Sequence, residues 1–139
     1  MHLTTQQDPS VVEPSTLEVK LYSAAGLGDI DAVQTLLNQG AEVNAQNYEG
    51  ETALFQGARQ GHNEVVQLLV GSGARAEIKS DSGWTPLHWA ARNGHEHIVR
   101  MLLEQSADSN SKSNSGRTAL SLAAEHGHKE ILRMLLYAD

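Results

Sequence analysis

The chain has 139 residues, a formal net charge of -7, 40% hydrophobic and 4% aromatic residues, and no cysteine. This length allows one domain with its own core, which must be mainly aliphatic because aromatic side chains are scarce. The missing cysteine excludes disulfides, thiolate metal sites and a cysteine nucleophile. The acidic charge and the scattered Lys and Arg residues argue against nucleic acid or an anionic membrane as a partner.

Residues 1–16 are polar and contain Pro9 and Pro14, so we predict a disordered, solvated tail there. The start of the chain lacks the basic and apolar regions of a signal peptide. No stretch approaches the roughly 20 apolar residues of a membrane span. The expected location is therefore cytoplasmic or nuclear.

A repeat of 33 residues organises the rest of the chain. Several residue types recur at that spacing in three copies, among them leucine, glycine and histidine: Leu54, Leu87 and Leu120, then Gly61, Gly94 and Gly127, then His62, His95 and His128. Such self-similarity predicts a solenoid of stacked units. We predict a repeat domain over 17–139, with repeats of about 17–49, 50–82, 83–115 and 116–139, the last incomplete.

Each repeat is predicted to fold as two short helices, as the third copy shows best. Thr85 suits a helix N-cap and Pro86 the first helical position, while Gly94 can end the helix at positive φ. A second helix is predicted from about residue 96 to 104. Helices this short are unstable alone in water and must pack on their neighbours.

The string Gly-x-Thr-Pro-Leu-His-x-Ala-Ala-x-x-Gly-His at residues 83–95 resembles the signature of the ankyrin repeat. The resemblance extends over residues 17–139. It implies an all-α repeat solenoid of stacked antiparallel helix pairs, with β-hairpin loops that project between repeats.

The copies depart from this pattern at informative places. Ser106 replaces the loop glycine of the third copy, where a positive φ would cost on the order of 1 kcal/mol. Phe55 stands in the place of His88. Gly57 replaces an alanine inside a predicted helix, at a cost of up to about 1 kcal/mol in helix propensity.

The resemblance implies a protein partner held by the hairpin tips and the exposed side of the first helices. Residues at these positions vary between copies while the framework repeats, and tryptophan and arginine among them are typical of interface hot spots. We assign Trp89 to core packing, and we expect Glu49 and Glu51 to lie in an exposed hairpin. The predicted partner-binding residues are Tyr48, Glu49, Glu51, Arg59, Gln60, Lys79, Asp81, Trp84, Arg92, Asn93, Asn114, Arg117, Glu125 and His126.

Metal binding and catalysis are the competing hypotheses. His97 and His126 are the two histidines near His95 and His128 that the repeat does not account for, which is weak evidence for zinc. No phosphate-binding glycine loop, hydrolase elbow or zinc-protease motif is present in the sequence. We therefore expect no enzyme, no metal and no cofactor.

The leading functional hypothesis is a protein-interaction module. The alternative is a structural or regulatory segment of a larger multidomain signalling protein. The last predicted helix, residues 129–137, keeps the apolar pattern of an internal repeat, although a terminal repeat usually has a polar outer face. We therefore also expect possible stacking of another molecule on this uncapped C-terminal repeat.

Overall fold

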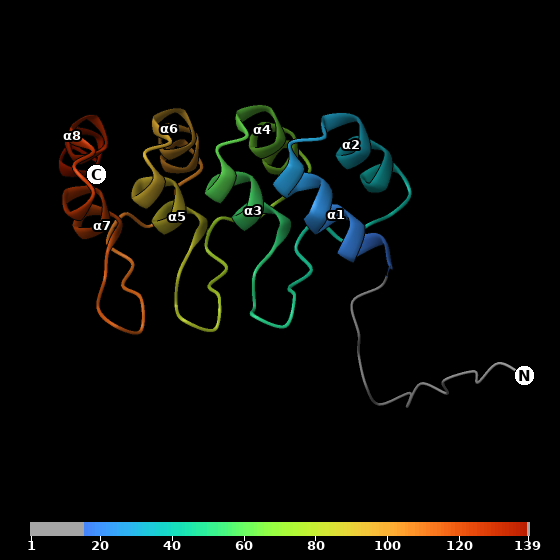
Figure 1. Ribbon diagram of the computed structural model, residues 1–139, viewed down its shortest axis with the longest axis horizontal. Helices are drawn as coiled ribbons and strands as arrows, with labels where there is room; N and C mark the ends of the chain where they lie inside the picture. The colour runs from blue at the N-terminus through green and yellow to red at the C-terminus, as the bar shows by residue number, and fades with distance from the viewer. Residues whose placement is uncertain (1–15, 139) are drawn as a thin grey trace, which may run out of the picture.

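The computed structural model describes residues 16–138, within which the chain forms eight α-helices and no strand. The helices form four pairs, and Figure 1 shows the odd-numbered helices in one layer and the even-numbered helices in a second layer above it. The helices are α1 (Thr16–Leu27), α2 (Ile30–Asn38), α3 (Ala53–Gln60), α4 (Asn63–Gly71), α5 (Pro86–Asn93), α6 (Glu96–Glu104), α7 (Ala119–Glu125) and α8 (Lys129–Leu136).

The observed helices confirm the predicted solenoid, including the second helix of the third copy at residues 96–104. Residues 1–15 of the predicted tail lie outside the described residues. Thr16, which we had placed in that tail, instead begins α1. None of the helices in the described range is long and apolar enough to cross a membrane.

The core is a continuous aliphatic layer between the two rows of helices. Leu54, Leu87 and Leu122 are almost completely buried on the odd row, and Val66 and Val99 are buried on the even row. Each helix packs against its pair partner and against its counterparts in the neighbouring repeats. Each helix pair therefore depends on its neighbours to cover its apolar side chains, which one pair alone would leave exposed to water.

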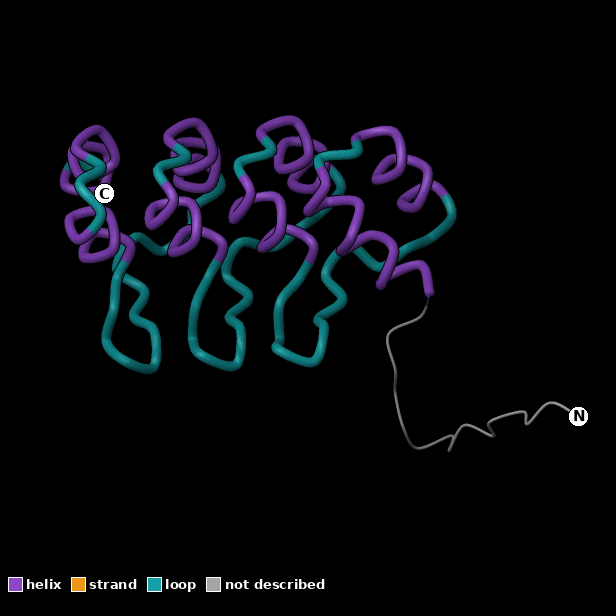
Figure 2. Tube along the Cα trace, viewed as in Figure 1, coloured by secondary structure: helices purple, strands orange, loops and turns teal. Residues whose placement is uncertain are grey.

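The loops between repeats are tight hairpins that project from the odd-helix layer (Figure 2). Each is closed by two backbone hydrogen bonds; in the second hairpin the Ser80 N–H donates to the Trp84 carbonyl and the Gly83 N–H to the Ser80 carbonyl, both at 2.8 Å. Neighbouring hairpins are joined because the Asp81 N–H donates to the Glu49 carbonyl and the Asn114 N–H to the Ser82 carbonyl, both at 2.9 Å. The predicted hairpins are therefore present, but their pairing is too short to form strands in the described range.

A recurring histidine joins each repeat to the one before it. The Nε2 atom of His62 lies 2.9 Å from the Gly26 carbonyl, that of His95 lies 2.9 Å from the Arg59 carbonyl, and that of His128 lies 2.8 Å from the Arg92 carbonyl. A carbonyl oxygen can only accept, so Nε2 carries the proton in each case. This contact explains the repeated His signal in the sequence.

The imidazole ring lies so close to the preceding repeat that a side chain would not fit there. A Cβ atom on Gly61 would come within 2.6 Å of the His95 ring, and one on Gly94 within 2.7 Å of the His128 ring. Both glycines also have φ near +80° (80° and 78°), which other residues rarely adopt. Glycine and histidine therefore recur together because they form the two sides of one contact.

Caps at the starts of the odd helices differ between repeats. The Thr85 side chain accepts from the His88 N–H, and the Nδ1 atom of His88 accepts from the Thr85 N–H, which completes a capping box. Burial of His88 lowers the pKa of its imidazole, which favours the neutral ring that this box requires. Phe55 has no side-chain acceptor for such a box, and its own N–H donates to the Thr52 carbonyl; the buried Thr52 hydroxyl has no hydrogen-bond partner among the described residues.

Two departures from the repeat pattern behave differently. Ser106 has a φ of 65°, so it adopts the positive φ whose cost was considered above, as Gly40 and Gly73 do at the same position of the earlier copies. Gly57 was expected only to weaken its helix. A Cβ atom there would come within 3.1 Å of Val66 Cγ2, so glycine also relieves crowding between α3 and α4.

The unequal caps predict unequal effects of the same substitution. Replacing Thr85 by valine removes the hydroxyl that caps α5, and we expect the free energy of unfolding to fall by about 1–2 kcal/mol. Replacing Thr52 by valine removes a buried hydroxyl that makes no bond, so we expect a change within about 0.5 kcal/mol or a small gain. Urea denaturation of both variants measures the difference, and equal losses of stability would contradict the cap assignment.

Candidate functional site

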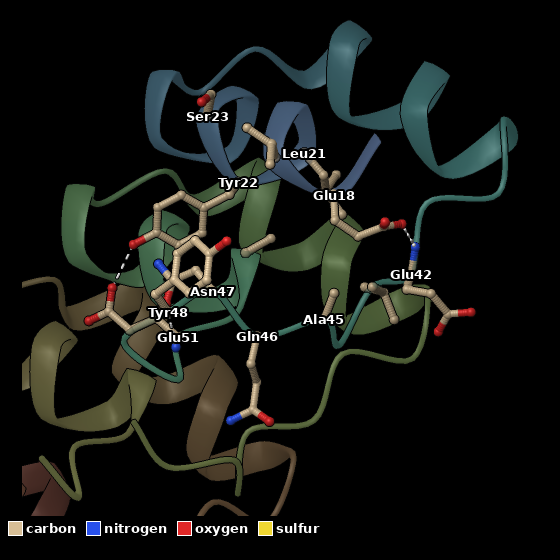
Figure 3. A pocket seen from close by; sticks show the side chains of 13 residues that line it. Glu18, Leu21, Tyr22, Ser23, Glu42, Ala45, Gln46, Asn47, Tyr48 and Glu51 are labelled. Atoms are coloured by element: carbon tan, nitrogen blue, oxygen red, sulfur yellow. Dashed lines mark hydrogen bonds between the residues drawn. The ribbon is translucent and has the colours of Figure 1, made fainter. Parts of the chain in front are cut away.

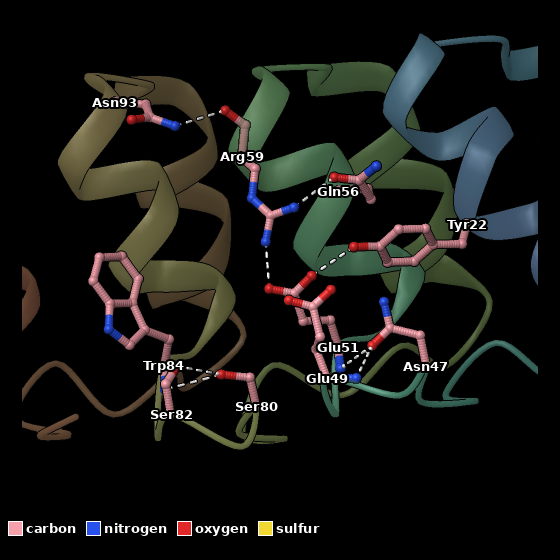
Figure 4. Close-up of polar contacts among 10 residues, drawn as sticks. All are labelled: Tyr22, Asn47, Glu49, Glu51, Gln56, Arg59, Ser80, Ser82, Trp84 and Asn93. Atoms are coloured by element: carbon pink, nitrogen blue, oxygen red, sulfur yellow. Dashed lines mark hydrogen bonds and ion pairs between the residues drawn. The ribbon is translucent and has the colours of Figure 1, made fainter. Parts of the chain in front are cut away.

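Several of the predicted partner-binding residues lie on the face of the odd-numbered helices above the hairpins, and Figure 4 shows Glu49, Glu51, Arg59, Trp84 and Asn93 among them. At its centre lies a group of four side chains from α3, α5 and the hairpin before α5, which we call the tryptophan cluster: Arg59, Trp84, Trp89 and Arg92. All four side chains are partly buried. Large side chains are thus held in place while part of their surface faces solvent.

Ring contacts define the geometry of the tryptophan cluster. The rings of Trp84 and Trp89 are tilted by 43° with centroids 4.5 Å apart. The guanidinium carbon of Arg59 lies 4.2 Å from the Trp89 ring centroid, and that of Arg92 lies 5.8 Å from it. Each such cation–π contact contributes about 0.5–2 kcal/mol depending on its burial. Trp89 is therefore the ring that both arginines share.

A buried carboxylate holds Arg59 in position. Glu51 forms an ion pair with Arg59, and its second oxygen accepts a 2.5 Å hydrogen bond from the Tyr22 hydroxyl. A further Arg59 nitrogen donates to Gln56 Oε1 at 2.8 Å. Burial of Tyr22, and then its bond to Glu51, raise the pKa of the phenol. Three repeats thus contribute to the orientation of one guanidinium, since Tyr22 is in the first, Arg59 in the second and the ring it covers in the third.

The expectation that Glu51 is exposed is wrong. Its residue surface is 7% exposed, whereas the hairpin residue Glu49 is exposed. The carboxylate can be buried because Arg59 neutralises its charge and Tyr22 satisfies its second oxygen. Glu51 therefore orients Arg59, while Glu49 lies at the hairpin tip.

The remaining predicted residues are spread along the same face. Arg117 and Glu125 form an exposed ion pair of 3.2 Å, and Asn93 donates to the Arg59 carbonyl at 2.9 Å. Asn114 donates to the Asp81 carbonyl at 2.8 Å. Tyr48 lies away from the tryptophan cluster, at the first hairpin. The exposed residues of the set are Tyr48, Glu49, Gln60, Lys79, Asp81, Asn114, Arg117, Glu125 and His126.

Sequence reasoning missed two members of this site. Trp89 had been assigned to core packing, but its ring forms the centre of the tryptophan cluster; its indole Nε1 is buried without a hydrogen-bond partner. A signal for Trp89 existed, because its register position holds Ser23, Gln56 and Leu122 in the other copies. For Tyr22 no comparable signal pointed to a bond with Glu51.

Of the histidines considered as metal ligands, His126 and His128 are engaged in the fold, while His97 is exposed. The His126 and His128 rings are stacked with centroids 6.3 Å apart, but His126 bonds to the Leu122 carbonyl and His128 to the Arg92 carbonyl. Among residues 16–138, no group of three or more His, Asp or Glu side chains is arranged to hold a metal ion. The geometry offers a contact surface of mixed aromatic and charged groups.

These features define an all-α repeat solenoid with a preformed side-chain surface along one layer. A family model described as ankyrin repeats (3 copies) matches residues 58–139, and a second, described as ankyrin repeats (many copies), matches residues 21–70. The chain belongs to the ankyrin repeat family.

Two curated relatives share part of the chain. The ankyrin repeat protein RF_p14 of Rickettsia felis is 46% identical over 43 residues, which cover 31% of this chain and 68% of that protein. The ankyrin repeat protein RF_pd14 of the same organism is 45% identical over 42 residues, which cover 30% of this chain and 64% of that protein. The likeness is confined to little more than one repeat length.

The buried position of Glu51 predicts a contrast with its neighbour Glu49. We expect Glu51→Gln to lower the free energy of unfolding by about 1–3 kcal/mol, because Arg59 then remains partly buried without its counter-charge. Glu49→Gln is the matched control, and as an exposed change it should alter stability by less than about 0.5 kcal/mol. Urea denaturation followed by circular dichroism measures both, and similar values for the two variants would refute the orienting role of Glu51.

Proposed function

We propose that the chain is a protein-interaction module that binds a partner protein through the tryptophan cluster and the hairpin tips beside it. Ankyrin repeats are generally protein–protein interaction modules, which supports the class of function. The observation that carries the particular surface is the pair of tilted indoles, Trp84 and Trp89, held between two arginines on an open face. The proposed role is binding, with no catalytic step.

Chemistry and rigidity both favour this surface. Tryptophan and arginine are the residue types most enriched at interface hot spots. Because Glu51, Gln56 and the Trp89 ring already fix Arg59, little side-chain entropy remains to be lost when a partner binds. The charged residues Lys79 and Asp81 are exposed in the same hairpin as Trp84, and suit the polar rim of an interface.

The proposal includes a cytoplasmic or nuclear location, and a partner that is neither nucleic acid nor membrane. The net charge of -7 supports this limit because it disfavours approach to polyanions. The alternative role is that of a structural or regulatory segment within a larger multidomain signalling protein. Under that alternative the tryptophan cluster carries no partner, which separates the two functions experimentally.

An affinity capture experiment with matched variants tests the surface. We expect the Trp84→Ala, Arg92→Ala double variant to lose a partner protein that the unmodified chain retains, with recovery reduced at least tenfold. The matched control is Gln67→Ala, Arg100→Ala, which removes an exposed pair, one of them also an arginine, from the even-numbered helices α4 and α6. Circular dichroism checks that both variants are folded. A partner recovered equally with both double variants would eliminate this surface.

We also propose that a second copy of the chain docks on the outer side of the fourth repeat. Inside the stack, a Cβ atom on Gly61 or Gly94 would meet the histidine of the next repeat, whereas one on Gly127 would meet nothing within 4 Å of the described atoms. Leu136 and Tyr137 at the end of α8 are 62% and 82% exposed. The counterparts of Leu136 in the inner repeats, Leu103, Val70 and Leu37, are partly buried, so Leu136 is more open than its position is elsewhere in the stack.

Light scattering over a range of concentrations tests this docking. We expect the mass of the unmodified chain to rise toward twice the monomer value, and that of Leu136→Lys to stay monomeric because a buried ammonium group disfavours the contact. Val19→Lys, an exposed apolar residue at the other end of the stack, is the control and should still dimerise. A strict monomer at millimolar concentration would rule out the self-association.

A further inference from the structure

A small apolar pocket lies at the other end of the solenoid, between α1 and the first hairpin (Figure 3). Its volume is about 280 Å³, which is enough for one large side chain. Val19 and Leu21 of α1 line it from one side, and Val43 and Ala45 of the hairpin from the other. None of the four residues of the tryptophan cluster lines it, although Tyr22 and Glu51, which hold Arg59 in position, lie at its edge.

One backbone group beside the pocket lacks the bond that its counterparts make. The Asp81 N–H donates to the carbonyl of Glu49, one hairpin earlier, and the Asn114 N–H donates in the same way to Ser82. Tyr48 is the equivalent residue of the first hairpin, and its N–H makes no hydrogen bond with the described residues. An extended peptide placed beside this hairpin would present a carbonyl to Tyr48, as each hairpin does to the next.

The charge around the pocket is negative. Glu18, Glu42 and Glu51 line it, while no Lys or Arg among the described residues does. Arg59 neutralises Glu51, and Glu18 accepts a 2.7 Å hydrogen bond from the Glu42 backbone N–H. The Glu42 side chain is exposed and forms no ion pair with the described residues, so a ligand that enters beside it is favoured if it carries positive charge.

We propose that this pocket binds an extended segment of a partner protein, in which an apolar side chain fills the cavity and an adjacent lysine or arginine faces Glu42. The pocket supplies the apolar contact, the Tyr48 N–H supplies a backbone donor, and the acidic rim supplies the preference for a basic neighbour. The chain's own residues 1–15 contain Val11 and Val12, but the charged residues nearest to them are Asp8 and Glu13. That sequence has the wrong charge for this rim.

Peptide titrations followed by nuclear magnetic resonance test the proposal on the full chain. The probes are capped pentapeptides Gly-Lys-X-Lys-Gly in which X is leucine, isoleucine, phenylalanine or tryptophan. We expect at least one to shift the amide signals of Ala45 and Tyr48 in a saturable way. The same peptides with glutamate in place of lysine should bind at least tenfold more weakly.

Two substitutions should weaken binding without unfolding the chain, because each introduces the residue that the second hairpin has at the same position. Ala45→Ile copies Ile78 and reduces the cavity, and Glu42→Arg copies Arg75 and reverses the charge at the rim. Each should weaken peptide binding at least fivefold. Glu64→Arg, an exposed charge reversal on α4, is the matched control and should bind as the unmodified chain does.

The outcomes that overturn the proposal are distinct. The proposed peptide class is wrong if no lysine peptide shifts the pocket amides, or if the glutamate peptides bind equally well. A full-length Val11→Asp, Val12→Asp variant tests the other occupant. If it moves the Ala45 and Tyr48 signals without added peptide, the chain's own N-terminal segment fills the pocket. Trp84→Ala should leave binding of the lysine peptides unchanged. The test of this pocket can therefore fail without affecting the proposal that the tryptophan cluster binds a partner protein.

Discussion

The contact between each histidine and a carbonyl of the preceding repeat sets the spacing of the whole stack. Helices of seven to twelve residues do not persist singly in water, so each pair depends on its neighbours for stability. Aliphatic packing provides most of that stabilisation but has little direction. The imidazole adds direction, because its Nε2–H reaches one carbonyl at 2.8–2.9 Å and its ring fits only against a glycine. Register and close approach are therefore specified together.

Arg59 connects this framework with the surface proposed to bind a partner. Its backbone carbonyl accepts from both Asn93 and His95, which joins the second repeat to the third. Its side chain pairs with Glu51 and covers the Trp89 ring. The stacking that stabilises the solenoid thus also determines where the guanidinium lies. A rigid surface of this kind suits a binding module, because its shape exists before the partner arrives.

The two ends of the described stack differ from its middle for the same physical reason. In the inner repeats, the next repeat covers each hairpin, and its histidine ring covers the glycine at the end of each odd-numbered helix. At the first hairpin, the Tyr48 N–H and the apolar pocket beside it have no such neighbour among the described residues. At the fourth repeat, Gly116 and Gly127 would meet nothing within 4 Å. In the inner repeats the next repeat covers the equivalent surfaces. The first hairpin and the fourth repeat are therefore the places where we propose contacts with a peptide and with a second copy of the chain.

The sequence by itself determined the framework of this protein. The 33-residue spacing, the Thr85 cap and the paired glycines and histidines predicted the helices and the order of the stack, because each of these signals reflects a local backbone requirement or a contact repeated at fixed separation. Even the positive φ of Ser106 followed from its register position. Only the tertiary structure decided the surroundings of single side chains. The bond of Tyr22 to Glu51 spans 29 positions and the contact of Arg59 with the Trp89 ring spans 30 (89 − 59), and no repeat pattern relates these pairs.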